Sequence, residues 1–127
     1  MAADHQLRDA RTGQVLVPRL ERATTFWQRL RGLMFRRPLQ PGEGLLIVPC
    51  RSIHTHWVRQ AIDVALMDRD GVVLSVHPNV RPWRMVHGTK DTHAVLETAG
   101  GFLVDRVRAG CCFKVELAAG TNANQAK

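Results

Sequence analysis

The pattern of apolar and polar positions along the chain predicts a mainly β protein. Residues 45–49 form a continuous apolar run, and residues 61–68 place apolar side chains on both faces of an extended strand. Both patterns are typical of strands that are buried on two sides. Shorter runs predict further strands at 15–17, 72–76, 93–99 and 112–117. Pro18 is expected to end the pairing of the first of these or to confine it to an edge.

One segment near the start of the chain has the signals of a short helix. Thr25 and Gln28 have the spacing of a capping box, in which each side chain binds the backbone N–H of the other residue. Gly32 is expected to end the helix, because glycine readily adopts the left-handed conformation found there. The i, i+4, i+7 spacing predicts one buried face made of Phe26, Leu30 and Leu33.

Turn and loop signals divide the rest of the chain. Asp70 and Gly71 predict a two-residue type I′ hairpin turn between two strands. Residues 78–90 contain two prolines and predict a long irregular connection, and residues 102–107 predict a short helix. We expect a single domain over residues 1–118 and a disordered tail over residues 119–127.

Composition and charge narrow the class of protein. The 127 residues, 45% of them hydrophobic, suit one globular domain. No apolar run approaches the ~20 residues of a membrane helix and the start lacks a secretory pattern, so we expect no membrane insertion and a cytoplasmic location. The protein is basic, with 18 Lys and Arg against 11 Asp and Glu for a net charge of +7. The cations are dispersed rather than clustered, which disfavours nucleic-acid binding.

Six short motifs occur in order along the chain: RGLMFR at 31–36, GLLI at 44–47, IHT at 53–55, IDV at 62–64, LMDRDG at 66–71 and LETAGG at 96–101. With these motifs the chain resembles the family called domain of unknown function 192, over about residues 23–115. The resemblance implies a compact single β domain, a jelly-roll-like sandwich or distorted barrel with one short N-terminal helix. It implies no established activity, cofactor or catalytic residue.

The chain departs from the family pattern in two places. Residues 56–59 read His-Trp-Val-Arg, where the family usually has an aromatic residue or glycine and then Met and Arg. Gly110 is followed by Cys111, where the family usually has an aspartate. The loss of that acid weakens any site built from several carboxylates. Asp63 and Glu97 are the acids that remain in the motifs.

Asp63 stands inside an apolar strand, and a buried carboxylate requires a partner. The candidate partners are Arg59, His54, His56 and a loop amide, so a structural anchor is the favoured interpretation. Glu97 is interpreted in the same way, with an arginine or a backbone amide as its partner.

His54 and His56 are spaced so that a strand would point both rings to one face, as in a metal pair. A third ligand would have to come through the fold, from Cys50, His77 or His93. No nearby triplet completes the set, so we predict no metal and no cofactor. A hydrolase-like or metal-assisted enzyme that uses His54, His56 and Asp63 is the alternative function.

The three cysteines do not point to a particular function. Cys50, Cys111 and Cys112 are an odd count, and the adjacent pair lacks the geometry of an ordinary disulfide. We expect small buried thiols, and a redox role for Cys111 and Cys112 stays open.

Trp83 lies among arginines in the 78–90 segment, and Trp57 lies beside the histidines. If that segment packs against residues 54–59, it frames the main pocket, a cleft suited to a small anionic or sugar-like ligand. Alternatively, Trp83 fills the end of the β domain. The favoured function is a module that binds an unknown small molecule or protein. Its candidate residues are His54, Thr55, His56, Trp57, Arg59, Asp63, Trp83, Arg84 and Glu97.

Overall fold

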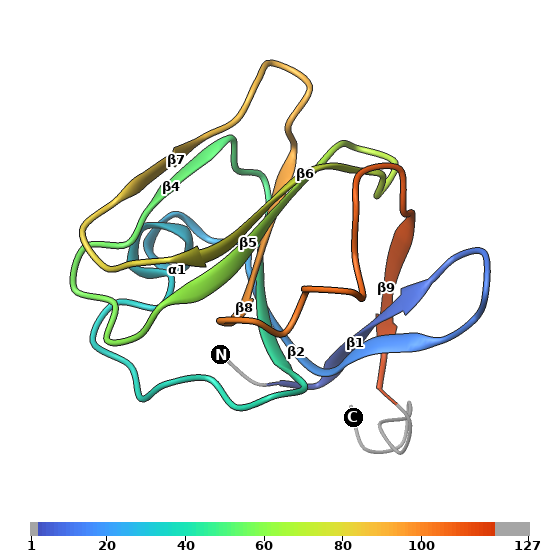
Figure 1. Cartoon of the computed structure of the whole chain (residues 1–127), viewed down its shortest axis with the longest axis horizontal. Helices are drawn as coiled ribbons and strands as arrows, with labels where there is room; N and C mark the ends of the chain where they lie inside the picture. The colour runs from blue at the N-terminus through green and yellow to red at the C-terminus, as the bar shows by residue number, and fades with distance from the viewer. Residues whose placement is uncertain (1–2, 119–127) are drawn as a thin grey trace.

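The computed structural model describes residues 3–118, and this part of the chain has nine strands and one short helix (Figure 1). The prediction of a mainly β domain with a single helix near its start is confirmed, whereas the jelly-roll arrangement stays a prediction. The expected tail, 119–127, lies outside the described residues. The elements are β1 (His5–Asp9), β2 (Val15–Ala23), α1 (Phe26–Arg31), β3 (Glu43–Ile47), β4 (Ser52–His54), β5 (Ile62–Met67), β6 (Val73–Val80), β7 (Met85–His87), β8 (Ala94–Ala99) and β9 (Phe113–Leu117).

Seven strands form one sheet in the order β6-β5-β8-β3-β2-β1-β9. Only β2 and β3 are parallel neighbours within it. The two edge strands approach each other where they begin, because Val72 forms a bridge with Cys112 and the Val73 N–H donates to the Cys111 carbonyl at 2.7 Å. The sheet is therefore curled until its edges touch, which satisfies backbone groups that an open edge would expose.

Both faces of this sheet are covered by apolar side chains. Adjacent residues of one strand point to opposite faces, so Leu46 and Ile47 belong to different clusters. All six residues of β5 are buried, as the two-sided apolar pattern predicted. The first cluster includes Leu7, Leu20, Leu46, Leu96, Leu103 and Phe113. The second includes Leu33, Ile47, Ile53, Ile62, Val64 and Val95.

A second sheet of two strands, β4 and β7, lies on the side of the second cluster, with α1 beside it (Figure 1). Its formation corrects the prediction of an irregular connection over residues 78–90. The strand β6 continues through Pro78 to Val80, and β7 follows after one loop. Proline is tolerated here because β6 is an edge strand of the larger sheet.

Pro18 was wrongly expected to end a strand or to mark an edge. It lies inside β2, between β1 and β3. The pairing with β1 is irregular between Val17 and Leu20, and the pairing with β3 begins only at Arg19. The missing N–H of proline therefore falls where the pairing with β1 is irregular and the pairing with β3 has not begun, so it costs no regular ladder bond.

The hairpin turn between β5 and β6 differs from the predicted type I′ turn. The Asp68 N–H donates to the Val72 carbonyl at 3.0 Å, which leaves three residues in the loop. Gly71 has a φ of 83°, but Asp70 does not have a positive φ. The Asp68 carboxylate accepts hydrogen bonds from the Asp70 and Val72 backbone amides and so stabilises the longer loop. The loop is thus a three-residue turn with glycine at its left-handed position.

The capping box of α1 is confirmed, since Thr25 Oγ1 accepts the Gln28 N–H and Gln28 Oε1 accepts the Thr25 N–H, each at 3.2 Å. Gly32 ends the helix with a φ of 51°. The predicted buried face is wrong, because the six-residue helix buries none of its side chains. Only Leu33, which follows the helix, reaches the core.

One further expectation about an element is wrong, and one strand was not predicted. Residues 102–107 form turns rather than a helix, because the Leu103 N–H is bound by the Asp63 carboxylate. The strand β1 was not predicted, because His5–Asp9 contains one apolar residue and is held between β2 and β9. In residues 3–118 no helix has the length and apolar character needed to cross a membrane.

Candidate functional site

Thr55 joins two loops at one end of the molecule. Its side chain is fully buried, and Oγ1 donates to the Arg81 carbonyl at 2.7 Å and accepts the Arg84 N–H at 2.8 Å. The Trp83 N–H donates to the Thr55 carbonyl at 3.1 Å. The loop between β6 and β7 is therefore fixed against the loop that follows β4 (Figure 1). Because it is buried, Thr55 positions other residues and does not face solvent.

Five rings form a connected surface that we call the aromatic patch: Phe35, His54, His56, Trp57 and Trp83. Ring centroids are 4.6 Å apart for Trp57 and Trp83, 5.0 Å for His56 and Trp83, and 4.9 Å for His54 and His56. The ring centroids of Phe35 and Trp57 are 5.9 Å apart. Trp83 is 53% exposed, so it lies on the surface and does not fill the end of the β domain.

The backbone of the aromatic patch is strained. Phe35, Trp57 and Trp83 have φ values of 61°, 61° and 66°, a region that bulky residues rarely adopt. Hydrogen bonds hold these conformations, since the Phe35 N–H donates to the Trp57 carbonyl at 3.0 Å and Trp83 is bound to Thr55. Each strained residue costs roughly 1–3 kcal/mol, and such residues concentrate at functional sites. Sequence reasoning did not find Phe35, which no pattern links to the tryptophans.

Asp63 forms no hydrogen bond with any residue of the aromatic patch among the described residues. It is fully buried, and its carboxylate accepts three backbone amides: Asn79 at 2.8 Å, Gly101 at 2.9 Å and Leu103 at 2.8 Å. The predicted loop-amide anchor is what the structure has, whereas the predicted partners Arg59, His54 and His56 are wrong. Arg59 is exposed instead. The alternative function, an enzyme that uses His54, His56 and Asp63 together, therefore has no carboxylate available beside the histidines.

The two histidines interact with each other. His54 Nδ1 accepts the His56 backbone N–H at 3.2 Å. Burial lowers the pKa of His54, and the nearby charge of His56 lowers it further. The ring is therefore neutral at pH 7 and carries its proton on Nε2. Within residues 3–118 no three ligand-type side chains gather as a metal site would require.

Glu97 on β8 is the unexpected residue. It is 3% exposed, and no hydrogen bond joins its carboxyl to another group among the residues that the structure describes. The expected partner, an arginine or an amide, is absent from that set, because Arg36 is paired with Glu21 at 2.6 Å. Burial raises the pKa of Glu97 to about 8, against a smaller lowering by the charge of Arg36. Glu97 is thus a neutral acid at pH 7.

This raised pKa predicts that stability falls as the pH rises from about 5 to about 7. Between the ordinary pKa of 4.5 and the folded value of about 8, the folded chain binds one more proton than the unfolded chain. The contribution of Glu97 to the free energy of unfolding is complete below the lower value and disappears above the higher one. The slope is about 1.4 kcal/mol per pH unit, or on the order of 3 kcal/mol over this range.

Urea denaturation of the wild type and of Glu97→Gln at several pH values checks this expectation. Glutamine keeps the shape but does not ionise, so the difference between the two proteins isolates Glu97. His54 acts in the opposite direction, because its lowered pKa removes stability as the pH falls, and it is present in both proteins. Equal pH slopes in the two proteins would contradict a neutral buried Glu97.

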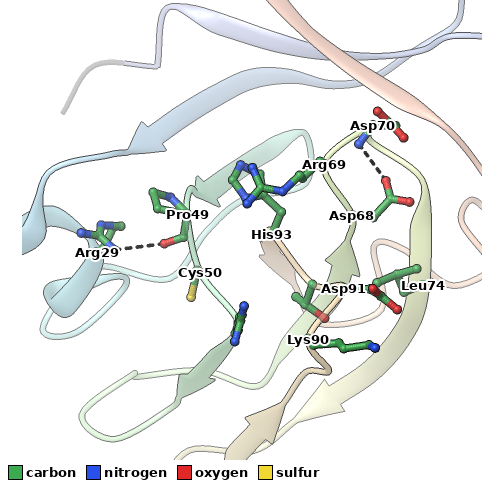
Figure 2. Close-up of a pocket in the computed structure, with 12 residues that line it drawn as sticks. Arg29, Pro49, Cys50, Asp68, Arg69, Asp70, Leu74, Lys90, Asp91 and His93 are labelled. Carbon is green, nitrogen blue, oxygen red and sulfur yellow. Dashed lines mark hydrogen bonds between the residues drawn. The ribbon is translucent and has the colours of Figure 1, made fainter.

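The main pocket lies elsewhere, which corrects the expectation that Trp83 and its loop frame it. Its volume is about 730 Å³, and it is formed by residues from four segments (Figure 2). Its lining mixes basic residues, among them Arg69 and Lys90, with Asp68, Asp70 and Asp91. Burial raises the pKa of the Cys50 thiol in this pocket, so Cys50 is not an activated nucleophile. The four segments are far apart in the sequence, so no motif spacing could have predicted that they form one pocket.

Solved structures of other proteins share the fold of this chain. A crystal structure of a protein of unknown function from Novosphingobium aromaticivorans is similar with a TM-score of 0.72 and 25% identity, over 88% of this chain and 82% of that one. A protein from Sinorhizobium meliloti, described as a candidate transcription regulator, has a TM-score of 0.73 and 23% identity, over 87% and 91%. At that identity the likeness shows the fold alone.

No curated protein matches the chain. The family model of domain of unknown function 192, described as "Uncharacterized ACR", matches residues 7–121. This span contains all six motifs noted in the sequence and all elements from β2 to β9. The chain therefore belongs to the domain of unknown function 192 family.

Proposed function

We propose that the protein is a binding module and that the aromatic patch receives a ligand with a ring and a negative charge. The observation that carries this proposal is the combination of strain and exposure at Phe35, Trp57 and Trp83. All three adopt a positive φ, and 53%, 49% and 53% of their surfaces are exposed. A structure that only needed stability would bury such side chains or relax their backbone.

The chemistry of the patch supports the choice of ligand. Half-exposed indole rings present flat apolar faces that stack on aromatic or sugar rings. Arg81 and Arg84 flank Trp83 and are exposed, and the guanidinium fork of arginine matches carboxylate and phosphate oxygens. His56, in contact with Trp83, adds a polar edge. A ring that bears an anionic group would use both kinds of contact.

Tryptophan fluorescence tests the proposal. Glucuronate, glucose 6-phosphate and benzoate supply a ring and a charge together, whereas glucose and acetate supply one of the two. At least one ring anion is expected to change the emission of the wild type, with a weaker response to glucose and to acetate. Trp83→Ala is expected to abolish the change.

Trp27→Ala is the matched control, because Trp27 is 74% exposed on α1 and does not belong to the aromatic patch. The control variant is expected to respond as the wild type does. No response to any ring anion, or an equal response after Trp83→Ala, would contradict binding at the patch.

A further inference from the structure

A small pocket lies behind His54, between the end of α1 and the sheet. Its volume is about 140 Å³, and its walls include Gly32, Leu33, Ile47, Ser52, His54 and Glu97. This volume is comparable with the ~150 Å³ cavity that holds benzene in an engineered protein, so it suits a group of a few heavy atoms. Gly32 leaves room for it, since a Cβ built there would lie 3.8 Å from Glu97 Oε1.

Glu97 gives this pocket its chemistry. The side chain is almost fully buried, lines the pocket, and has no hydrogen-bond partner among residues 3–118. A buried carboxylate without a partner is far less stable than a buried carboxylic acid, so the group is protonated. A protonated carboxyl offers one O–H donor and one carbonyl acceptor side by side. Neither is used within the described part of the chain.

Two neighbouring groups add donors. His54 holds its proton on Nε2, because Nδ1 accepts the His56 N–H. Arg29 also lines the pocket, and its buried Nε–H has no acceptor in the part of the chain that the structure describes, although Nη1 donates to the Pro49 carbonyl at 3.1 Å. Unsatisfied buried polar groups are rare in native proteins and call for an explanation.

We propose that this pocket is a binding site for an uncharged carboxamide group, which pairs with the carboxyl of Glu97 through one accepted and one donated hydrogen bond. The carbonyl oxygen of the amide accepts the Glu97 O–H, and its N–H donates to the other Glu97 oxygen. The site shares His54 with the aromatic patch but is lined by neither Trp57 nor Trp83, and it does not depend on ring binding at the patch.

The donor and acceptor of the Glu97 carboxyl decide between ligand classes, because the charges of Arg29 and Arg31 alone would favour an anion. A carboxylate would accept the Glu97 O–H but would place its second oxygen against an acceptor, and it would lose its hydration. An ammonium would meet Arg29 and Arg31, which both line the pocket. A carboxamide needs no buried charge and matches both functions of the neutral acid. The apolar walls formed by Leu33 and Ile47 suit the carbon side of such a group.

Acetamide is the probe, and two-dimensional NMR of the full chain at pH 6 is the measurement. Titration is expected to shift the backbone signals of Gly32 and Ile47, with a dissociation constant on the order of millimolar for so small a ligand. Acetate and methylammonium are expected to bind at least about tenfold more weakly. Tighter binding of acetate than of acetamide would identify an anion site and overturn the proposal.

Variants of Glu97 complete the test. Glu97→Gln is expected to retain acetamide binding within a few-fold, because a glutamine amide also presents a donor beside an acceptor. Glu97→Met, which is similar in size, is expected to lose it.

Equal acetamide binding by the wild type and by Glu97→Met would overturn the proposal, as would the absence of shifts at Gly32 in a folded wild-type protein. Trp83→Ala separates this inference from the function proposed above. That variant is expected to bind acetamide normally, even where it no longer responds to ring anions.

Discussion

Replacement of Gly71 with valine is expected to lower the free energy of unfolding by about 4 kcal/mol or more. Gly71 has a φ of 83°, which β-branched residues rarely adopt. In addition, a Cβ at this position would lie 2.1 Å from the Phe113 carbonyl oxygen. That oxygen belongs to the start of β9, where the two edges of the large sheet meet, so the clash separates them. Urea denaturation monitored by circular dichroism measures the loss.

Gly13→Val provides the matched control for this variant. Gly13 also has a positive φ, at 77°, but a Cβ there would have no atom within 4 Å. Its replacement carries only the backbone strain, on the order of 1 kcal/mol. Equal losses in the two variants would show that the contact with Phe113 contributes nothing and that strain alone acts.

The second large effect is expected at Asp63. Asp63→Ala should lower the free energy of unfolding by about 3–5 kcal/mol, because it leaves the amides of Asn79, Gly101 and Leu103 without their acceptor. These amides belong to the end of β6 and to the loop after β8, so both segments lose their attachment to β5. Chemical denaturation and amide hydrogen exchange of the two segments provide the measurement.

Two variants sharpen this test. Asp63→Asn keeps one carbonyl oxygen but turns a donor toward one of the amides, so an intermediate loss is expected. Asp68→Ala is the control, because Asp68 also accepts two backbone amides, those of Asp70 and Val72, but is partly exposed. Water replaces the lost acceptor there, and the loss should stay near 1 kcal/mol. A loss below about 0.5 kcal/mol for Asp63→Ala, the usual surface effect, would rule out the anchor.

Local patterns in the sequence were sufficient for the elements whose signals are short-range. The two-sided apolar run of β5, the run of β8 and the capping box of α1 depend on neighbouring residues alone. Six ordered motifs were sufficient to recognise the family. The presence of a carboxylate in an apolar strand also predicted that Asp63 anchors a loop, because burial without partners is too unfavourable.

Only the tertiary structure decided which groups meet. The partners of Asp63 lie 16 to 40 residues away, and Thr55 binds residues 26 and 29 positions further along the chain. Such contacts depend on strand order and register, which no local pattern contains. The same reason explains why a helix with apolar spacing stays exposed and why β1 forms from a mostly polar segment: each outcome depends on the neighbour that the fold supplies. Glu97 is a further example. The sequence predicts that this buried acid has an arginine or an amide as its partner, whereas the fold places its side chain against a pocket.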